Sequence, residues 1–157
     1  MGMTTREINQ MELIGMMHDI GKIAISDRVL NKKGTLTAKE WSELKRHPEI
    51  GYRILSSSTD MAYIAEYVLK HHERMDGKGY PNGISGDKIP LESRIVAVAD
   101  AYAAMTNERA YKEGMPETGA IEELRAKSGT QFDAEVVEIF IKKVLKPDYA
   151  AEPANAK

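Results

Sequence analysis

The stretch that decides how this chain is interpreted is KHHERMDGKGYP, residues 70–81. It places two adjacent histidines at the end of an apolar run and then continues through two glycines and a proline. Because glycine permits positive φ and proline fixes φ, this segment predicts a tight turn in which Tyr80 is a packed anchor. Two of the chain's four histidines are therefore expected side by side where a helix ends.

The composition of the 157 residues, 42% of them hydrophobic, predicts one domain with a proper core. The net charge of −2 argues against a nucleic-acid surface held by bulk electrostatics, but it permits a small anionic ligand held by local cations. No apolar run approaches the roughly 20 residues that cross a bilayer, and the N-terminus lacks the pattern of a signal peptide. We therefore expect a soluble, cytoplasmic segment that binds neither nucleic acid nor membrane.

The chain contains no cysteine, which excludes disulfides, thiol nucleophiles and thiolate metal sites together. Any metal must then be held by imidazole and carboxylate groups. That ligand set suits iron, manganese, zinc or nickel.

Residues that start and stop helices are frequent along the chain, and alternation of apolar with polar residues, which marks strands, is rare. The sequence therefore predicts an all-α fold. Thr37 and Glu40 form a capping box, and Asp60 and Asp133 are placed to cap helices of their own. Pro48 is expected to end one helix and open the next. The predicted helices cover about residues 6–19, 37–47, 48–55, 60–72, 90–105, 116–127 and 133–145. Residues 146–157 lack periodicity, and we expect a frayed or disordered tail.

The side chains that carry chemistry are all four histidines and two aspartates: His18, Asp19, His47, His71, His72 and Asp100. The side chains of neighbouring helical residues point about 100° apart, so an adjacent pair can contact one site from two directions. An aspartate beside a histidine can bridge two metal ions about 3.5 to 4 Å apart. A single histidine is more often a core or surface residue, and a lone aspartate can be a satisfied buried group. The six together favour a metal site.

Four blocks of the chain resemble, in order, the motifs of the HD-GYP family of bacterial phosphodiesterases, within the HD superfamily of metal-dependent phosphohydrolases. The blocks are HDIGKI (18–23), HHERMDGKGYP (71–81), RIVAVADAYAAMTNERAYK (94–112) and GTQFDAEVV (129–137). The pair His47-Pro48 falls between the first two blocks, as it does in the family. The resemblance covers about residues 8–145.

The resemblance implies an HD-domain-like helical bundle over residues 1–145. It also implies hydrolysis of cyclic di-GMP to linear pGpG, and in some members to GMP, by a hydroxide shared between metal ions. Two divalent ions are implied, iron or manganese most often, with a third in some members. One metal would be held by His18, Asp19 and Asp100, and the other by His47, His71 and His72, with Asp19 bridging.

The resemblance also assigns roles to residues around the metals. Asp19 and Lys22 would be catalytic, with Lys22 on the scissile phosphate, while Arg109 and Lys112 would hold the substrate's phosphates. The GYP loop comprises Asp76, Gly77, Gly79, Tyr80 and Pro81, and it is expected to be structural first. In the family it is associated with partner contacts, including diguanylate cyclases.

The sequence departs from the family pattern in two ways that matter. HD domains carry another histidine on a helix upstream of the HD pair, and this chain begins after that point, so we expect a domain that is partial at its N-terminus. The metal of His18 and Asp100 would be the weaker one, and uncovered apolar faces would favour a homodimer. Ala103 stands where relatives often have aspartate.

The sequence is also compatible with two other functions. A non-catalytic module that binds cyclic di-GMP or a partner protein would fit the missing upstream ligand. An HD phosphohydrolase of another nucleotide would fit the metal ligands, although the HHE…DGKGYP block favours cyclic di-GMP.

Overall fold

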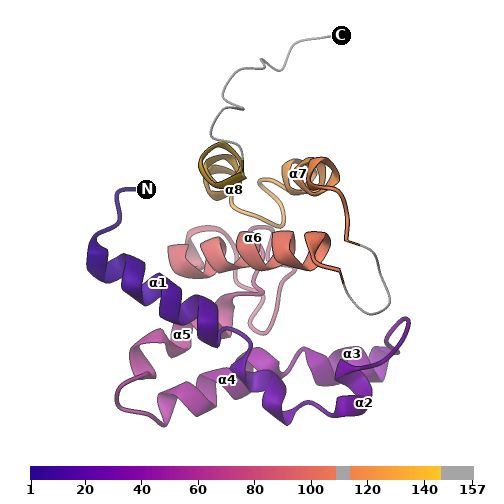
Figure 1. Cartoon of the computed structure of the whole chain (residues 1–157). Coiled ribbons are helices and arrows are strands. Elements are labelled where there is room, and N and C mark those ends of the chain that lie inside the picture. Colours follow the sequence, from indigo (N-terminus) through magenta and orange to yellow (C-terminus); the bar gives the residue numbers. More distant parts are fainter. Residues whose placement is uncertain (109–113, 146–157) are drawn as a thin grey trace.

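The computed structural model describes residues 1–108 and 114–145, and this part of the chain is helical without a named strand (Figure 1). Its only bridge of β type joins Ser128 and Phe132. The prediction of an all-α fold is confirmed. The helices are α1 (Thr5–Met17), α2 (Asp27–Leu30), α3 (Ala38–Leu44), α4 (His47–Ser56), α5 (Ala62–Lys70), α6 (Leu91–Thr106), α7 (Glu117–Ala126) and α8 (Ala134–Phe140).

Helix α6 lies in the middle of the molecule, with α7 and α8 on one side and α1, α4 and α5 on the other (Figure 1). Two opposite faces of α6 supply two separate cores. Val98 packs with residues of α7 and α8, including Leu124 and Val137, and Val96 packs with Ile14 and Val68. Because α6 packs into both cores, its backbone is held rigidly, and so is the position of Asp100, which lies on this helix.

The predicted helix starts are correct at two of three caps. The Thr37 hydroxyl accepts from the Glu40 N–H and the Glu40 carboxylate accepts from the Thr37 N–H, so the capping box opens α3. Asp133 accepts from the backbone of Glu135 and Val136 at the start of α8. The prediction for Asp60 was wrong, because α5 begins after Met61 and has no side-chain cap.

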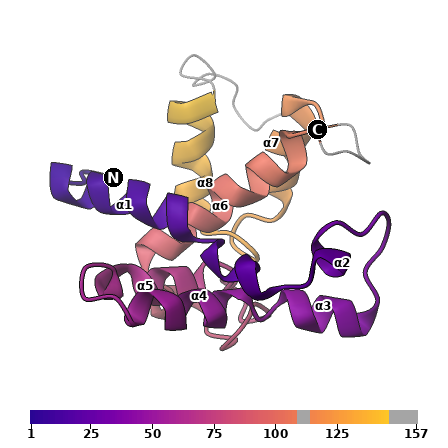
Figure 2. The same ribbon diagram turned by 60° about the horizontal axis from the view of Figure 1, so that its bottom comes forward.

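The first helix ends at Met17, two residues earlier than predicted. The chain then makes a 3₁₀ turn at Ile20–Ala24, which packs against α4. Gly21 lies directly on the His47 carbonyl, where a Cβ would overlap the backbone of α4. This close approach brings the end of α1 to the start of α4, and α2 and α3 extend beyond α4 at one end of the molecule (Figure 2).

The last predicted helix also differs, because α8 ends at Phe140 and the chain continues as a π-helical turn at Ile141–Leu145. The predicted tail at 146–157 lies outside the described residues. Within the part that is described, no helix has the length and apolar character needed to span a bilayer.

Candidate metal centre

The six predicted side chains converge from four separate segments. His18 and Asp19 follow the last turn of α1, and His47 is the first residue of α4. His71 and His72 follow α5, and Asp100 projects from α6. Helix termini thus supply five of the six residues, where the side chains are free to point away from their own helix.

Three of the histidines are oriented by the same local hydrogen bond. The Nδ1 atoms of His18, His47 and His71 lie 2.6, 2.8 and 2.6 Å from the carbonyl oxygen of the residue three positions earlier. A carbonyl can only accept, so Nδ1 carries a proton, and in the neutral ring Nε2 keeps its lone pair. This arrangement, in which the outer nitrogen is tied to the backbone, is typical of histidines that ligate metals.

Asp19, His47, His71 and His72 form a compact set of donors. One ligand atom from each lies within 4.8 Å of the other three. The Nε2 atoms of His47 and His71 are 3.4 Å apart, and His47 Nε2 is 3.3 Å from Asp19 Oδ1. His47 and His71 are buried. Lone pairs that face each other in a buried site repel unless a cation lies between them, so this donor set fits a divalent metal ion.

A second group of donors adjoins the first through Asp19. His18 Nε2 is 3.4 Å from Asp19 Oδ2 and 3.7 Å from Asp100 Oδ1. This nitrogen is buried and has no hydrogen-bond partner among the described residues. Asp19 therefore turns one oxygen toward His47 and the other toward His18, which is the geometry that a bridging carboxylate needs. Binding by each of these residues stays a prediction.

The pKa shifts also separate the two groups of donors, that of His18 and that of His47, His71 and His72. The adjacent carboxylates of Asp100 and Asp19 raise the pKa of His18 to about 10, whereas burial lowers the pKa of His71 to about 4. Burial alone would raise the pKa of Asp19, but hydrogen bonds from His18 and Lys22 outweigh it and hold that pKa well below its usual range. His71 is thus neutral and Asp19 ionised, the forms that bind metals, whereas His18 carries a proton that a metal ion would have to displace.

The predicted substrate contacts are placed only in part. Lys22 Nζ is 2.5 Å from Asp19 Oδ2, so the lysine lies at the edge of the cluster and neutralises the carboxylate. Arg109 and Lys112 lie outside the described residues.

The GYP loop packs directly on the cluster. Tyr80 stacks on His72 with ring centroids 4.8 Å apart, and its N–H donates to the His72 carbonyl. The packed tyrosine agrees with the prediction. Gly77 has the expected positive φ of 76°, but Gly79 is needed for a different reason. A Cβ at Gly79 would lie 2.5 Å from the backbone of Glu73 and Arg74.

Two acidic side chains keep this loop in place. The Asp76 carboxylate accepts from the Arg74 guanidinium at 2.9 and 2.7 Å, which supports its structural role. Glu73 is buried, and its Oε1 accepts from the N–H groups of Asn82 and Gly83 at 2.7 and 3.2 Å. The bonds of Glu73 were not foreseen, although the residue lies within the HHE block.

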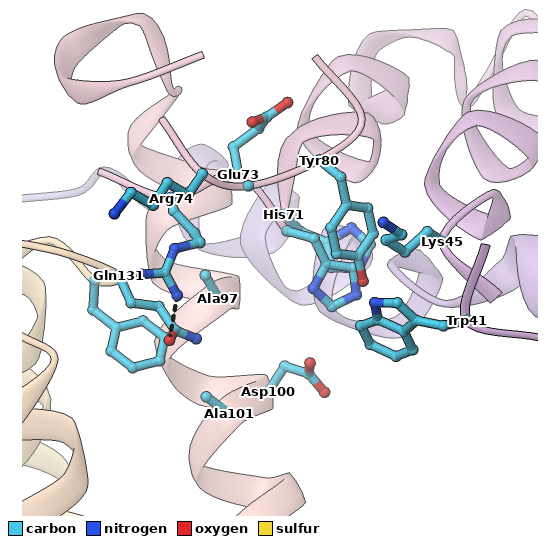
Figure 3. Close-up of a pocket in the computed structure, with 14 residues that line it drawn as sticks. Trp41, Lys45, His71, Glu73, Arg74, Tyr80, Ala97, Asp100, Ala101 and Gln131 are labelled. Carbon is cyan, nitrogen blue, oxygen red and sulfur yellow. Dashed lines mark hydrogen bonds between the residues drawn. The ribbon is translucent and has the colours of Figure 1, made fainter. Parts of the chain in front are cut away.

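A cavity of about 460 Å³ opens beside the cluster, within the usual size range of small-molecule sites (Figure 3). His71, His72 and Asp100 line it on the metal side. Its other walls were missed by the sequence analysis: Trp41, Lys45, Arg74, Gln131 and Phe132. Signals existed for four of them, since Trp41 is a large aromatic residue directly after the capping box, and Arg74, Gln131 and Phe132 lie within the quoted blocks, but none was given a role in the site.

Fold and site together define an all-helical domain with a histidine and aspartate cluster suited to divalent metal ions, placed at the side of an open cavity. Residues 1–136 match the model of a known family, described as HD domain. The chain belongs to the HD domain family, and the resemblance stated from its motifs is confirmed at that level.

Curated relatives act on cyclic dinucleotides. The chain is 44% identical over 144 residues to the cyclic di-GMP phosphodiesterase response regulator RpfG of Xanthomonas campestris, covering 90% of this chain and 38% of that protein. It is 38% identical over 142 residues to 3'3'-cGAMP-specific phosphodiesterase 2 of Vibrio cholerae, covering 89% of this chain and 27% of the relative. The chain therefore spans well under half the length of these relatives.

A solved structure shares the fold. The cyclic GMP-AMP specific phosphodiesterase V-cGAP3 of V. cholerae superposes with a TM-score of 0.69 at 20% identity. The match covers 93% of this chain and 40% of the solved chain.

Proposed function

We propose that this chain is the catalytic part of a metal-dependent phosphodiesterase that hydrolyses cyclic di-GMP to linear pGpG and then to GMP. The observation that carries the proposal is the position of the cluster. Its donors His71, His72 and Asp100 line the wall of a cavity of ligand size, so a bound phosphodiester would meet the metal ligands directly. The identity of about 40% to phosphodiesterases of cyclic dinucleotides supports this choice of substrate class.

Divalent ions held by the cluster would supply positive charge to the phosphate and acidity to a water molecule. His47, His71, His72 and Asp19 would hold one ion, and Asp19 with His18 and Asp100 a second, iron or manganese being the expected metals.

The protein's own groups would do three further tasks. The backbone hydrogen bonds of the histidines keep Nε2 aimed inward, so little reorganisation is needed on binding. Lys22 adds a fixed positive charge beside Asp19, where negative charge on the phosphate increases during the reaction. Tyr80 covers the His72 ring and limits access of water to that side.

The test is a product analysis of the chain loaded anaerobically with Fe(II) or Mn(II). Cyclic di-GMP, 3'3'-cGAMP and a panel of mononucleotides are each incubated with the protein, and the products are separated by chromatography. The proposal expects pGpG and GMP from cyclic di-GMP, with loss of product in Asp19→Asn. Lys39→Gln is the matched control, because Lys39 is exposed on α3 and does not line the cavity.

The other outcomes point to other functions. Faster turnover of 3'3'-cGAMP would assign the chain to the substrate named for the V. cholerae relative. Tight binding of cyclic di-GMP without product in the metal-loaded protein would identify a non-catalytic binding module. Faster turnover of a mononucleotide would identify a phosphohydrolase of another substrate.

A further inference from the structure

One wall of the cavity comes from the end of α3 and was not assigned any role. Trp41 and Lys45 are four residues apart, so they lie on the same face of the helix. Both approach Tyr80 of the GYP loop. The Trp41 ring meets the Tyr80 ring edge to face at 6.5 Å between centroids, and Lys45 Nζ lies 5.9 Å from the Tyr80 centroid (Figure 3).

Among the described residues, Lys45 has no carboxylate partner, in contrast to Arg74 and Lys22. Arg74 is held by Asp76 and Gln131 on the opposite wall, and Lys22 is held by Asp19. Lys45 is half-buried, and within the described residues its charge meets only the face of Tyr80. Lys78 also lines the cavity, but it is exposed to solvent. A half-buried ammonium group without a counter-ion is well placed to bind an anionic ligand.

Trp41 supplies the second half of the same wall. Its side chain is 45% exposed at the cavity, which is a large apolar surface for a residue on a short helix. Only the edge contact with Tyr80 is described for its ring, so a ring face remains for a ligand. Aromatic faces beside a cation are the usual elements with which proteins bind bases and phosphates of nucleotides.

We propose that Trp41 and Lys45 form a nucleotide subsite along α3, in which Lys45 binds a phosphate oxygen of the substrate and Trp41 stacks on a purine base. The inference rests on the proposed function, because it names how the same cavity recognises a cyclic dinucleotide. The metal cluster provides charge for one phosphate, and this wall provides the contacts that distinguish a dinucleotide from any other phosphodiester.

Trp41 is the only tryptophan of the chain, so its fluorescence reports on this wall alone. Cyclic di-GMP and 3'3'-cGAMP are titrated into the metal-loaded protein at a temperature at which turnover is slow. Saturable quenching is expected, and Lys45→Gln should weaken the fitted affinity by about tenfold or more, as loss of a hydrogen bond to a charged group does. Lys45→Arg should restore most of it, because the charge returns. Lys39→Gln removes the same charge from the same helix outside the cavity and should bind like the parent protein.

Calorimetry with Trp41→Phe and Trp41→Ala completes the test of the aromatic group. The phenylalanine variant should keep more affinity than the alanine variant, since it retains a stacking face. The subsite is refuted if cyclic dinucleotides bind by calorimetry without changing Trp41 fluorescence, and if Lys45→Gln and Lys39→Gln bind equally well.

A small substrate separates this inference from the proposed function. Bis(p-nitrophenyl) phosphate needs the metal centre but offers no purine, so Lys45→Gln should lower its turnover far less than that of a cyclic dinucleotide. If the metal-loaded parent protein hydrolyses neither substrate, the proposed function fails, while quenching and the Lys45 variants still decide the subsite. If the parent hydrolyses both and Lys45→Gln affects both alike, the subsite fails and the phosphodiesterase stands.

Discussion

The Nε2 atoms of His47 and His71 face each other at 3.4 Å, although His47 begins α4 and His71 follows α5, 24 positions along the chain. Each ring is turned toward the other by a hydrogen bond from Nδ1 to a backbone carbonyl. Both side chains are buried. Two lone pairs held in this way favour a cation between them. The hydrogen bonds that orient the rings are therefore the physical reason why this site suits a metal ion.

Metal binding should therefore depend on this pair of rings. His71→Gln is expected to lower Mn(II) affinity by more than the roughly 10- to 100-fold that loss of an outer hydrogen bond costs. In the parent protein, metal at 100 times its dissociation constant should stabilise the fold by about 2.7 kcal/mol. Thermal unfolding with and without metal, combined with metal analysis, measures both effects. An equal metal-dependent shift in His71→Gln and Lys39→Gln would contradict the assignment.

The metal-free protein should be most stable near pH 6.5. Burial lowers the pKa of His71 from 6.5 to about 4, so the unfolded state binds the proton more readily and stability falls as the pH drops from 6.5 toward 4. The adjacent carboxylates of Asp100 and Asp19 raise the pKa of His18 to about 10, so its contribution is complete below 6.5 and is lost as the pH rises toward 10. Urea unfolding in a chelator measures this profile. Burial lowers the pKa values of His47 and His72 as well, so His71→Gln should make the acid side less steep without abolishing it. His18→Gln should flatten the alkaline side, and two unchanged profiles would be evidence against these pKa directions.

Gly79 should tolerate no side chain. Gly79→Ala places a Cβ against the backbone of Glu73 and Arg74, which cannot yield as a flexible side chain would. We expect a loss of about 1 to 3 kcal/mol, as for overpacked sites, together with weaker metal binding through displacement of His72. Gly15→Ala is the control, since nothing lies within 4 Å of its added Cβ and alanine favours a helix. Chemical denaturation compares the two, and equal stabilities would show that the loop can shift.

The capping box of α3 should stabilise the fold and hold the wall that carries Trp41. Thr37→Ala removes the acceptor of the Glu40 N–H and should cost about 1 kcal/mol. Thr35→Ala, at an exposed position before the box, should change stability by less than half that amount. Urea unfolding gives both values, and Trp41 fluorescence shows whether the wall is disturbed before global unfolding. No difference between the two variants would mean that the cap is not needed.

Much of the fold could be predicted because its signals are local. The caps at Thr37 and Asp133, and the prolines before α6 and α7, act through hydrogen bonds and φ restrictions within a few residues. The prediction at Asp60 failed because it also used a local signal. An aspartate can form a turn as well as a helix cap, and α5 begins after Met61 without a cap from Asp60.

Which six residues come together could also be anticipated, because all four histidines of the chain and two aspartates occur at the positions and in the order of the family motifs. Their individual roles are still predictions, as are a homodimer, contact of the GYP loop with a diguanylate cyclase, and substrate binding by Arg109 and Lys112, which lie outside the described residues.

The sequence by itself determined the helical class, most helix boundaries and the set of histidines and aspartates, since each depends on neighbouring residues or on motif order. Only the tertiary structure decided that Asp19 turns one oxygen to His47 and the other to His18, and that Trp41 and Lys45 lie against Tyr80 in one wall of a cavity. These relationships depend on how α1, α3, α4, α5 and α6 pack. Packing is set by shape and close approach, such as Gly21 on the His47 carbonyl, which no periodicity in the chain records.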